Sequence, residues 1–290
     1  MNNKEIILKD RISEEFPDIK IRSIKSVTTG WCNDVIIVNN KIIFRFPKDK
    51  DAEDRLLLES SVLDYFRDKV NVDIPNYTYM PLSKKFAGYN MIEGGALTKQ
   101  FVGKLSKQER ASLVDSLADF ISEVHSTKKT HVKHLKIPFD NGEIISKETA
   151  RKVKKRVFPL LTKKETADIE KFIPVMLKSM AEMKGYGYTH NDLRGNHMFF
   201  NKKSRRLGVI DFGDFAWFDK AKDFSELIAL GTDFAEEVFE KYSCKKDKDT
   251  MNRAKIIYKR LGLVLMYESL EGYPMPFNEA HRFFRERFYG

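Results

Sequence analysis

Cysteine is scarce in this sequence: only Cys32 and Cys244 occur among 290 residues. Two cysteines cannot build a disulfide framework, so we expect a protein of a reducing compartment, the cytoplasm. Long hydrophobic runs are also missing. No stretch approaches 18 consecutive apolar residues, so we expect no membrane span and no membrane partner. Residues 1–9 carry charges of both signs rather than an apolar block, and no secretory signal is expected.

Glycine and proline are few, with 15 and 9 residues, which excludes a collagen and a low-complexity chain. The chain contains 42% apolar and 32% charged residues, enough for one large or two modest domains. Lysine and arginine exceed aspartate and glutamate by 52 to 42, a net charge of +10, which suits nucleic acid, an anionic membrane or phosphate-bearing ligands. The densest basic stretch, 151–156, has no interleaved aromatic residues. We interpret it as a solvated helix face and expect no nucleic-acid partner.

The patterning divides the chain after Glu93, where Gly94 and Gly95 interrupt it. Residues 1–93 are rich in short strands and residues 94–290 in helices, which predicts an α+β protein with an N-terminal and a C-terminal lobe. The first part has expected strands at 20–27, 35–39, 42–46, 76–81 and 87–92, with a helix at 52–68. The second has expected helices at 106–124, 147–158, 164–183, 223–242 and 251–271, with a hairpin joining 199–200 to 207–210.

Three residues in the second part suggest phosphoryl transfer. Asp192 lies in a polar loop, His190–His197, where its carboxylate can accept a hydroxyl proton. Asp211 ends a short apolar strand, and it could hold a divalent metal with His197 beside Asp192. Phosphoryl transfer to an alcohol needs such a base and a metal that neutralises phosphate charge. Mg²⁺ needs only one or two protein carboxylates, so this sparse ligand set is adequate.

These motifs resemble those of the aminoglycoside phosphotransferase family, whose catalytic loop reads H-x-D with Asn or His five residues after the aspartate. The His form is similar to the aminoglycoside 2″-phosphotransferases and also to the macrolide phosphotransferases. The resemblance implies a two-lobed protein-kinase-like fold, with an antiparallel-sheet N-lobe and a mainly helical C-lobe. It also implies that Asp192 is the catalytic aspartate, that His190 braces the loop, and that His197 and Asp211 bind Mg²⁺.

The N-terminal part resembles the nucleotide-binding lobe of the same family. Arg45, in the segment 43–48, takes the place of the phosphate-binding cation, and Glu59 that of its ion-pair partner. Kinases normally have lysine there, but arginine is always charged and can bind phosphate with two nitrogens. The resemblance places the phosphate loop at 28–33, where Thr28, Thr29 and Gly30 would contact phosphate.

The segment 87–94 resembles the kinase hinge, which implies that the backbone around Asn90 and Ile92 binds the nucleotide base. Phe199 and Ile210 would then pack beneath the base. Tyr89 takes the place of the residue at the back of the base pocket. Family members with a bulky tyrosine there tend to favour GTP, so we expect GTP as co-substrate, with ATP as the alternative.

An acidic stretch suggests the acceptor. Residues 219–240 contain seven acids against Lys220 and Lys222, a local inversion of sign that suits a cationic hydroxylated small molecule such as an aminoglycoside. We take Asp223 and Glu226 as candidate substrate residues, with an ordinary exposed helix face as the alternative. The family's acidic cluster is replaced here by 229–232, Ala-Leu-Gly-Thr. A macrolide, another aminated sugar or an amino alcohol therefore stays open as acceptor.

Two readings from other classes also remain: a nucleotide-binding pseudoenzyme and, from the charge alone, a nucleic-acid-binding protein. The intact set of Asp192, His197 and Asp211 disfavours the first, and the lack of a nucleic-acid motif disfavours the second. We expect a monomeric kinase that phosphorylates an aminoglycoside hydroxyl, at the 2″ position by resemblance.

Overall fold

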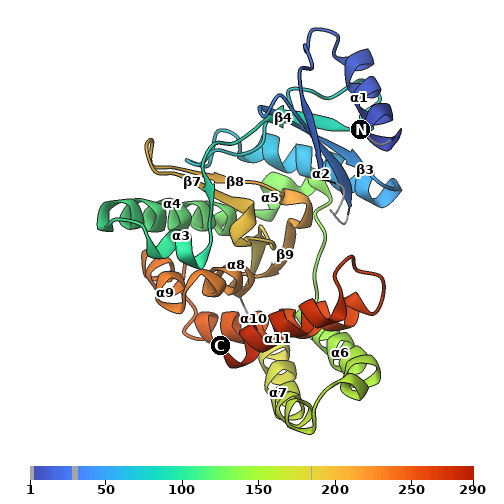
Figure 1. Ribbon diagram of the computed structural model, residues 1–290. Helices are drawn as coiled ribbons and strands as arrows, with labels where there is room; N and C mark the ends of the chain where they lie inside the picture. Colours follow the sequence, from blue (N-terminus) through green and yellow to red (C-terminus); the bar gives the residue numbers. More distant parts are fainter. Residues whose placement is uncertain (1–2, 28–31, 184) are drawn as a thin grey trace.

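A computed structural model describes residues 3–27, 32–183 and 185–290 (Figure 1). The N-terminal part is an antiparallel sheet in the order β1-β2-β3-β4. Its strands are β1 (Ile24–Val27), β2 (Asn33–Val38), β3 (Ile42–Pro47) and β4 (Ala87–Asn90). The predicted hairpin between β2 and β3 is confirmed, since Asn39 and Asn40 both take the positive φ that such a turn requires.

Helix α1 (Asn3–Glu15) was not expected in the strand-rich N-terminal part. Its buried Leu8 and Ile12 belong to the same apolar cluster as Ile36, Phe44 and Phe86 of the sheet region. Successive residues of a strand point to opposite faces, so Phe44 faces this cluster while Arg45 points to the other face. That alternation positions Arg45 toward helix α2 (Lys50–Phe66), which packs against β3.

The predicted strand at 76–81 is wrong. Only an isolated bridge joins Tyr79 to Gly88 there. Pro75 and Pro81 border the segment, and proline removes the N–H groups that a regular ladder needs. The predicted strand at 87–92 is correct in place, although it ends at Asn90.

The long helix expected from residue 106 is confirmed as α4 (Lys107–Ser126). Its capping box is complete: the Ser106 hydroxyl accepts from the Glu109 N–H, and the Glu109 carboxylate accepts from the Ser106 N–H. The helix is buried along one side by residues such as Leu113, Leu117 and Ile121. The short elements around it are β5 (Gly95–Ala96), α3 (Lys99–Gly103) and α5 (Lys129–Val132).

The predicted hairpin after the catalytic loop is confirmed as β7 (Met198–Asn201) and β8 (Arg206–Val209), which pair antiparallel. β5 extends this sheet, while β6 (Tyr186–Thr189) pairs with β9 (Ala216–Asp219). The polar loop that follows β6 and the turn that follows β8 therefore both lie at the ends of these paired strands. In Figure 1 these strands lie between the N-terminal sheet and the helices at the opposite end of the molecule.

Helices complete the C-terminal part: α6 (Gly142–Lys152), α7 (Lys163–Ala181), α8 (Ala221–Leu227), α9 (Thr232–Lys241), α10 (Thr250–Ser269) and α11 (Phe277–Tyr289). The single helix expected over 223–242 is divided, because Gly231 adopts a φ of 143° that interrupts helical geometry. The helix expected from 147 to 158 begins at Gly142 instead and passes into a π-helical turn, Val153–Val157. None of the described helices has the length and apolar character that crossing a bilayer requires.

Candidate active site

The loop after β6 is held in place by a buried carboxylate. Asp223, on α8, accepts hydrogen bonds from the backbone N–H groups of His190 (2.9 Å) and Asn191 (2.8 Å). It also contacts Nε2 of His125, on α4, at 3.0 Å. Burial alone would raise the pKa of Asp223, but the hydrogen bonds from His125 and from the backbone N–H of Asn191 outweigh it and lower the pKa. Asp223 is therefore an ionised anchor for the loop.

His190 contacts the loop from inside the protein. Its ring is fully buried against Phe120 and Phe212. Nε2 lies 3.2 Å from the carbonyl oxygen of Ile210, and Nδ1 accepts from the N–H of Asp192 at 3.3 Å. Burial lowers the pKa of His190, so the ring is neutral and both bonds specify one tautomer. The side chain positions Asp192 and Ile210 and does not itself line the cavity.

Asp192 lies between Arg194 and His197. Its Oδ2 is 2.6 Å from Nη2 of Arg194 and 3.3 Å from Nδ1 of His197. Burial would raise the pKa of Asp192, but the His197 hydrogen bond and the Arg194 charge dominate and hold the pKa far below its usual range. Asp192 is therefore ionised throughout the physiological range, with an oxygen held in place rather than free to rotate.

Asp211 completes the group from the turn after β8. Its backbone is left-handed (φ 67°, ψ 62°), a conformation that aspartate tolerates better than most residues. Oδ2 lies 3.5 Å from Nε2 of His197, and Oδ1 lies 3.1 Å from Nη2 of Arg45. Potential ligand atoms of Asp192, His197 and Asp211 all lie within 4.8 Å of one another. Two carboxylates and an imidazole at this spacing fit a divalent cation, and the carboxylates suit Mg²⁺.

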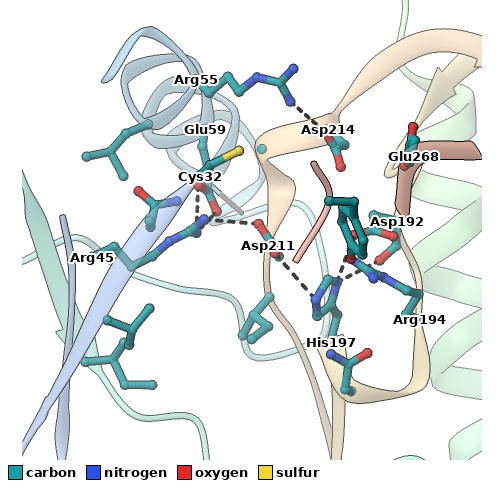
Figure 2. Close-up of a pocket in the computed structure, with 18 of the residues that line it drawn as sticks. Cys32, Arg45, Arg55, Glu59, Asp192, Arg194, His197, Asp211, Asp214 and Glu268 are labelled. Atoms are coloured by element: carbon teal, nitrogen blue, oxygen red, sulfur yellow. Dashed lines mark hydrogen bonds and ion pairs between the residues drawn. The ribbon is translucent and has the colours of Figure 1, made fainter. Parts of the chain in front are cut away.

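The predicted pairing of Arg45 with Glu59 is present and buried. Nη1 of Arg45 lies 2.7 and 2.8 Å from the two Glu59 oxygens and 3.1 Å from the hydroxyl of Tyr77. Glu59 also accepts the N–H of Phe212, at 3.1 Å. Burial raises the pKa of Glu59, although Arg45 acts in the opposite direction. Figure 2 shows Arg45 between Glu59 and Asp211, and His197 between Asp211 and Asp192.

A cavity of about 750 Å³ lies over these groups. It is bordered by the second and third strands, by α2, by the loop after β6 and by the end of α10. The predicted site residues that line it are Arg45, Glu59, Tyr89, Asp192, His197, Ile210 and Asp211.

Three predicted base contacts do not reach this cavity through their side chains. The described residues lining it do not include Asn90, Ile92 or Phe199. Ile92 instead packs so closely against Gly208 that a Cβ atom at position 208 would clash with the Ile92 side chain. Phe199 pairs with Ala96 and Gly208 in the sheet formed by β5, β7 and β8. Phe199 thus does not line this cavity, and its packing beneath the base stays a prediction. Thr28, Thr29 and Gly30 lie outside the described residues.

Asp223 was predicted to bind the acceptor, but it is too deeply buried to do so. Glu226 was predicted to do the same, and it lines a cavity but already has cationic partners within the protein. Asp223 is 1% exposed, lines neither cavity described here, and all its contacts go to the protein. Glu226 does line a second cavity, but Nη2 of Arg287 lies 2.9 Å and Nζ of Lys222 lies 3.8 Å from its oxygens. Other acids of 219–240 are paired as well, Asp219 with Arg253 and Glu237 with Arg110.

The sequence analysis did not predict a second cavity beside the first, on the side away from the N-terminal sheet. The second cavity, of about 290 Å³, shares Asp192, Arg194, Asp214, Glu268 and Tyr273 with the first, so the two are continuous at Asp192. Glu268 lies at the end of α10, outside any recognisable motif, and nothing in the local sequence marks it as a site residue. Arg194 lay within the catalytic loop motif, and its charge beside Asp192 was the available signal.

Comparisons with known proteins agree with this geometry. The family model APH, phosphotransferase enzyme family, matches residues 23–254. The fold is similar to the GDP complex of aminoglycoside 2'-phosphotransferase-IIIa, with 25% identity, 99% of this chain and 98% of that chain covered, and a TM-score of 0.86. It is also similar to the GDP and kanamycin complex of APH(2″)-IIIa (24% identity, 97% and 96% covered, TM-score 0.84). Macrolide 2'-phosphotransferase type I shares the fold at 12% identity (99% and 97% covered, TM-score 0.71).

Proposed function

The chain belongs to the phosphotransferase enzyme family, and from that premise we propose that it transfers the γ-phosphate of GTP or ATP to a hydroxyl of an amine-bearing small molecule. It is a phosphotransferase with an alcohol group as acceptor, and the family resemblance and the two-lobed kinase-like fold expected from its motifs are confirmed. The observation that carries the proposal is the gathering of Asp192, His197 and Asp211 beside Arg45 in one cavity.

In the proposed reaction, Asp192 orients the acceptor hydroxyl toward the phosphate. Its depressed pKa makes it a weak base, so it takes up the proton only as the oxygen–phosphorus bond forms. This suits a loose transition state, in which catalysis comes mainly from positioning and charge. Arg45 would contact the phosphates, held in position by Glu59. His197 and Asp211 would hold Mg²⁺, which, when bound, neutralises charge on the phosphate oxygens.

For the nucleotide, we propose GTP, with ATP as the alternative. Tyr89 is buried at the wall of the larger cavity and contacts the ring of Tyr77 edge to face, at 5.7 Å between centroids. We propose that the Tyr89 ring, supported by Tyr77 from behind, limits the space at the back of the base pocket. The similar structures contain GDP, ADP or ATP, so each purine nucleotide is a reasonable test. Phosphate contacts at Thr28, Thr29 and Gly30, and base contacts from the backbone at Asn90 and Ile92, remain predictions.

For the acceptor, we propose an aminoglycoside phosphorylated at its 2″-hydroxyl, with a macrolide, another aminated sugar or an amino alcohol as alternatives. Kanamycin and a macrolide kinase appear among the similar structures. Glu268 supports an amine-bearing acceptor: its carboxylate borders both cavities and forms no hydrogen bond or ion pair within the described ranges of the chain. Burial raises the pKa of Glu268, and a bound ammonium group would offset this by favouring the charged form.

We propose for the two lobes the same roles that the sequence predicts. Residues 1–93 would bind the nucleotide, and residues 94–290 would supply catalysis and the acceptor site. We propose a monomeric, cytoplasmic enzyme.

The test is nucleotide turnover with Mg²⁺ across kanamycin, gentamicin, a macrolide and simple amino alcohols, using GTP and ATP at matched low concentration. We expect acceptor-dependent formation of GDP or ADP, faster with GTP, and a phosphorylated acceptor detectable by mass spectrometry. A clear ATP preference contradicts the GTP proposal alone. Nucleotide binding without transfer to any acceptor contradicts the kinase proposal and favours a pseudoenzyme.

A further inference from the structure

The second cavity, beside Asp192, is lined by charges of both signs, and most of them already have partners. Asp192 pairs with Arg194, and Glu226 pairs with Arg287 and Lys222. Asp214 pairs with Arg55 at 2.8 Å, and Asp140 accepts a hydrogen bond from the Asn191 side chain at 3.1 Å. The acidic and basic side chains that line this cavity therefore largely neutralise one another's charge. A polycation would find few free carboxylates there.

Arg260 is the exception among the cations. It lies on α10, lines the second cavity and is only 5% exposed. Its Nε is buried with no hydrogen-bond partner, and the guanidinium forms no hydrogen bond or ion pair across residues 3–27, 32–183 and 185–290. Burial lowers the pKa of Arg260, and the more distant Tyr267, Asp140 and Glu268 offset this only in part. An unpaired buried charge is costly for a folded protein.

Arg253, a second buried arginine on α10, has a structural role and serves as a comparison for Arg260. Arg253 is also 5% exposed, but its guanidinium is fully engaged. Nε lies 2.8 Å from Asp219, and Nη1 lies 2.6 Å from Asp247. The two arginines share helix and burial and differ only in their partners. Arg253 ties α10 to β9, whereas Arg260 presents an uncompensated charge to a cavity.

We propose that Arg260 binds an anionic oxygen group of the acceptor, a carboxylate, while Asp192 orients the hydroxyl that is phosphorylated. The inference rests on the proposed phosphoryl transfer, and among the proposed acceptors it favours an aminated sugar or an amino alcohol over an aminoglycoside such as kanamycin, which has no carboxylate. A guanidinium binds a carboxylate through two parallel hydrogen bonds, which neither a sugar hydroxyl nor an ammonium group can match. The acceptor thus completes an ion pair that the protein leaves open.

Glu268 adds a second recognition element on the same helix. It follows Arg260 by two turns, a rise of about 12 Å along the axis. Because Glu268 suits an ammonium group and Arg260 a carboxylate, the wall fits an acceptor that carries both charges besides its hydroxyl. An amino sugar or amino alcohol bearing a carboxylate meets this description, whereas a simple polycation satisfies Glu268 and leaves Arg260 unpaired.

The first experiment compares thermal unfolding of the unliganded wild type, R260M and R253M. Methionine keeps the apolar volume of each arginine stem and removes the charge. We expect R253M to lower the melting temperature strongly, because Asp219 would be left buried without its partner. We expect R260M to match or exceed the wild type. A loss of stability in R260M as large as that in R253M would assign Arg260 a structural role and overturn the inference.

The second experiment uses two pairs of probes that differ in a carboxylate: L-homoserine with 3-aminopropan-1-ol, and muramic acid with glucosamine. Binding to the enzyme loaded with Mg²⁺ and GDP or ADP is measured by calorimetry, and turnover with GTP or ATP is measured alongside. In at least one pair, the carboxylate-bearing probe is expected to bind the wild type about 10- to 100-fold more tightly. R260M should abolish that preference and leave the affinity of the other probe unchanged.

The outcomes separate this inference from the proposed function. Absence of any carboxylate preference in both pairs overturns the inference, even if kanamycin is phosphorylated efficiently. An equal preference in wild type and R260M overturns it too, because another residue would then bind the carboxylate. Carboxylate-dependent binding without phosphoryl transfer to any acceptor supports the role of Arg260 and contradicts the kinase proposal.

Discussion

At the scale of single residues, the site is a set of charges held by fixed partners. Asp192 has one oxygen directed at both Arg194 and His197, and Asp211 has one oxygen on each side, toward His197 and Arg45. These contacts keep both carboxylates ionised and oriented before any ligand arrives. Preorganised charge of this kind avoids reorganisation during the reaction.

Asp192→Asn tests the residue scale. Asparagine keeps the shape of the side chain, but it cannot accept the hydroxyl proton and loses the ion pair with Arg194. We expect kcat to fall at least about 100-fold, with a circular dichroism spectrum like that of the wild type. Asp115→Asn is the matched control, since among the described residues exposed Asp115 pairs with Lys241 alone, at 3.3 Å. Near-normal turnover in the Asp192 variant would remove this carboxylate from the mechanism.

At the scale of elements, buried side chains of α2 and α8 connect the two parts of the site. Glu59, on α2, contacts Arg45 on β3 and the N–H of Phe212 in the turn after β8, so one carboxylate joins helix, sheet and turn. Asp223, on α8, holds the loop after β6 through two backbone N–H groups. The helices thereby set the distance between the N-terminal sheet and the loop after β6.

Glu59→Gln tests this connection. The change leaves the partly buried Arg45 facing a neutral amide, with Asp211 as its remaining carboxylate, so we expect the free energy of unfolding to fall by about 1–3 kcal/mol. The Michaelis constant for nucleotide should rise as well, because Arg45 loses its main orienting contact. Glu53→Gln on the same helix is the control. Glu53 contacts Lys85 and Lys50 at the surface, where ion pairs contribute little. Equal losses in denaturant unfolding for both variants would contradict the role given to Glu59.

At the scale of the whole molecule, a buried polar chain links α4, α8 and the segment after α9. Nδ1 of His125 lies 2.9 Å from the hydroxyl of Tyr242, and Nε2 lies 3.0 Å from Asp223. Burial lowers the pKa of His125, although Asp223 acts in the opposite direction. The folded protein thus holds a neutral imidazole that the unfolded chain would protonate in mild acid.

His125→Gln tests the pH dependence of this chain. With a folded pKa below the ordinary value of about 6.5, the unfolded state binds the extra proton as pH falls. Stability is therefore lost from about pH 6.5 downward until the folded pKa is reached. Denaturant unfolding of the wild type between about pH 7 and pH 5 should show this loss, with a slope of at most about 1.4 kcal/mol per pH unit from His125. The slope should be shallower in His125→Gln and unchanged in His131→Gln, a change at an exposed position. Equal slopes in all three proteins would exclude His125 as the acid-sensitive group.

The sequence by itself determined the grouping of two carboxylates and an imidazole in the candidate site. Asp192, His197 and Asp211 belong to one loop and the hairpin that follows it, so short-range geometry brings them together. The pairing of Arg45 with Glu59 was also readable, because a strand and the helix that follows it pack directly against each other.

Only the tertiary structure decided how the charges that line the second cavity are paired. Whether an acid faces a ligand or a protein partner depends on which cation folding brings beside it. Glu226 meets Arg287 from α11, and Asp223 meets His125 from α4, whereas Arg260 meets no partner among the described residues. These pairs join residues that lie far apart in the sequence. The sequence of one segment therefore cannot show whether its charges are neutralised, because the partner comes from another element packed against it.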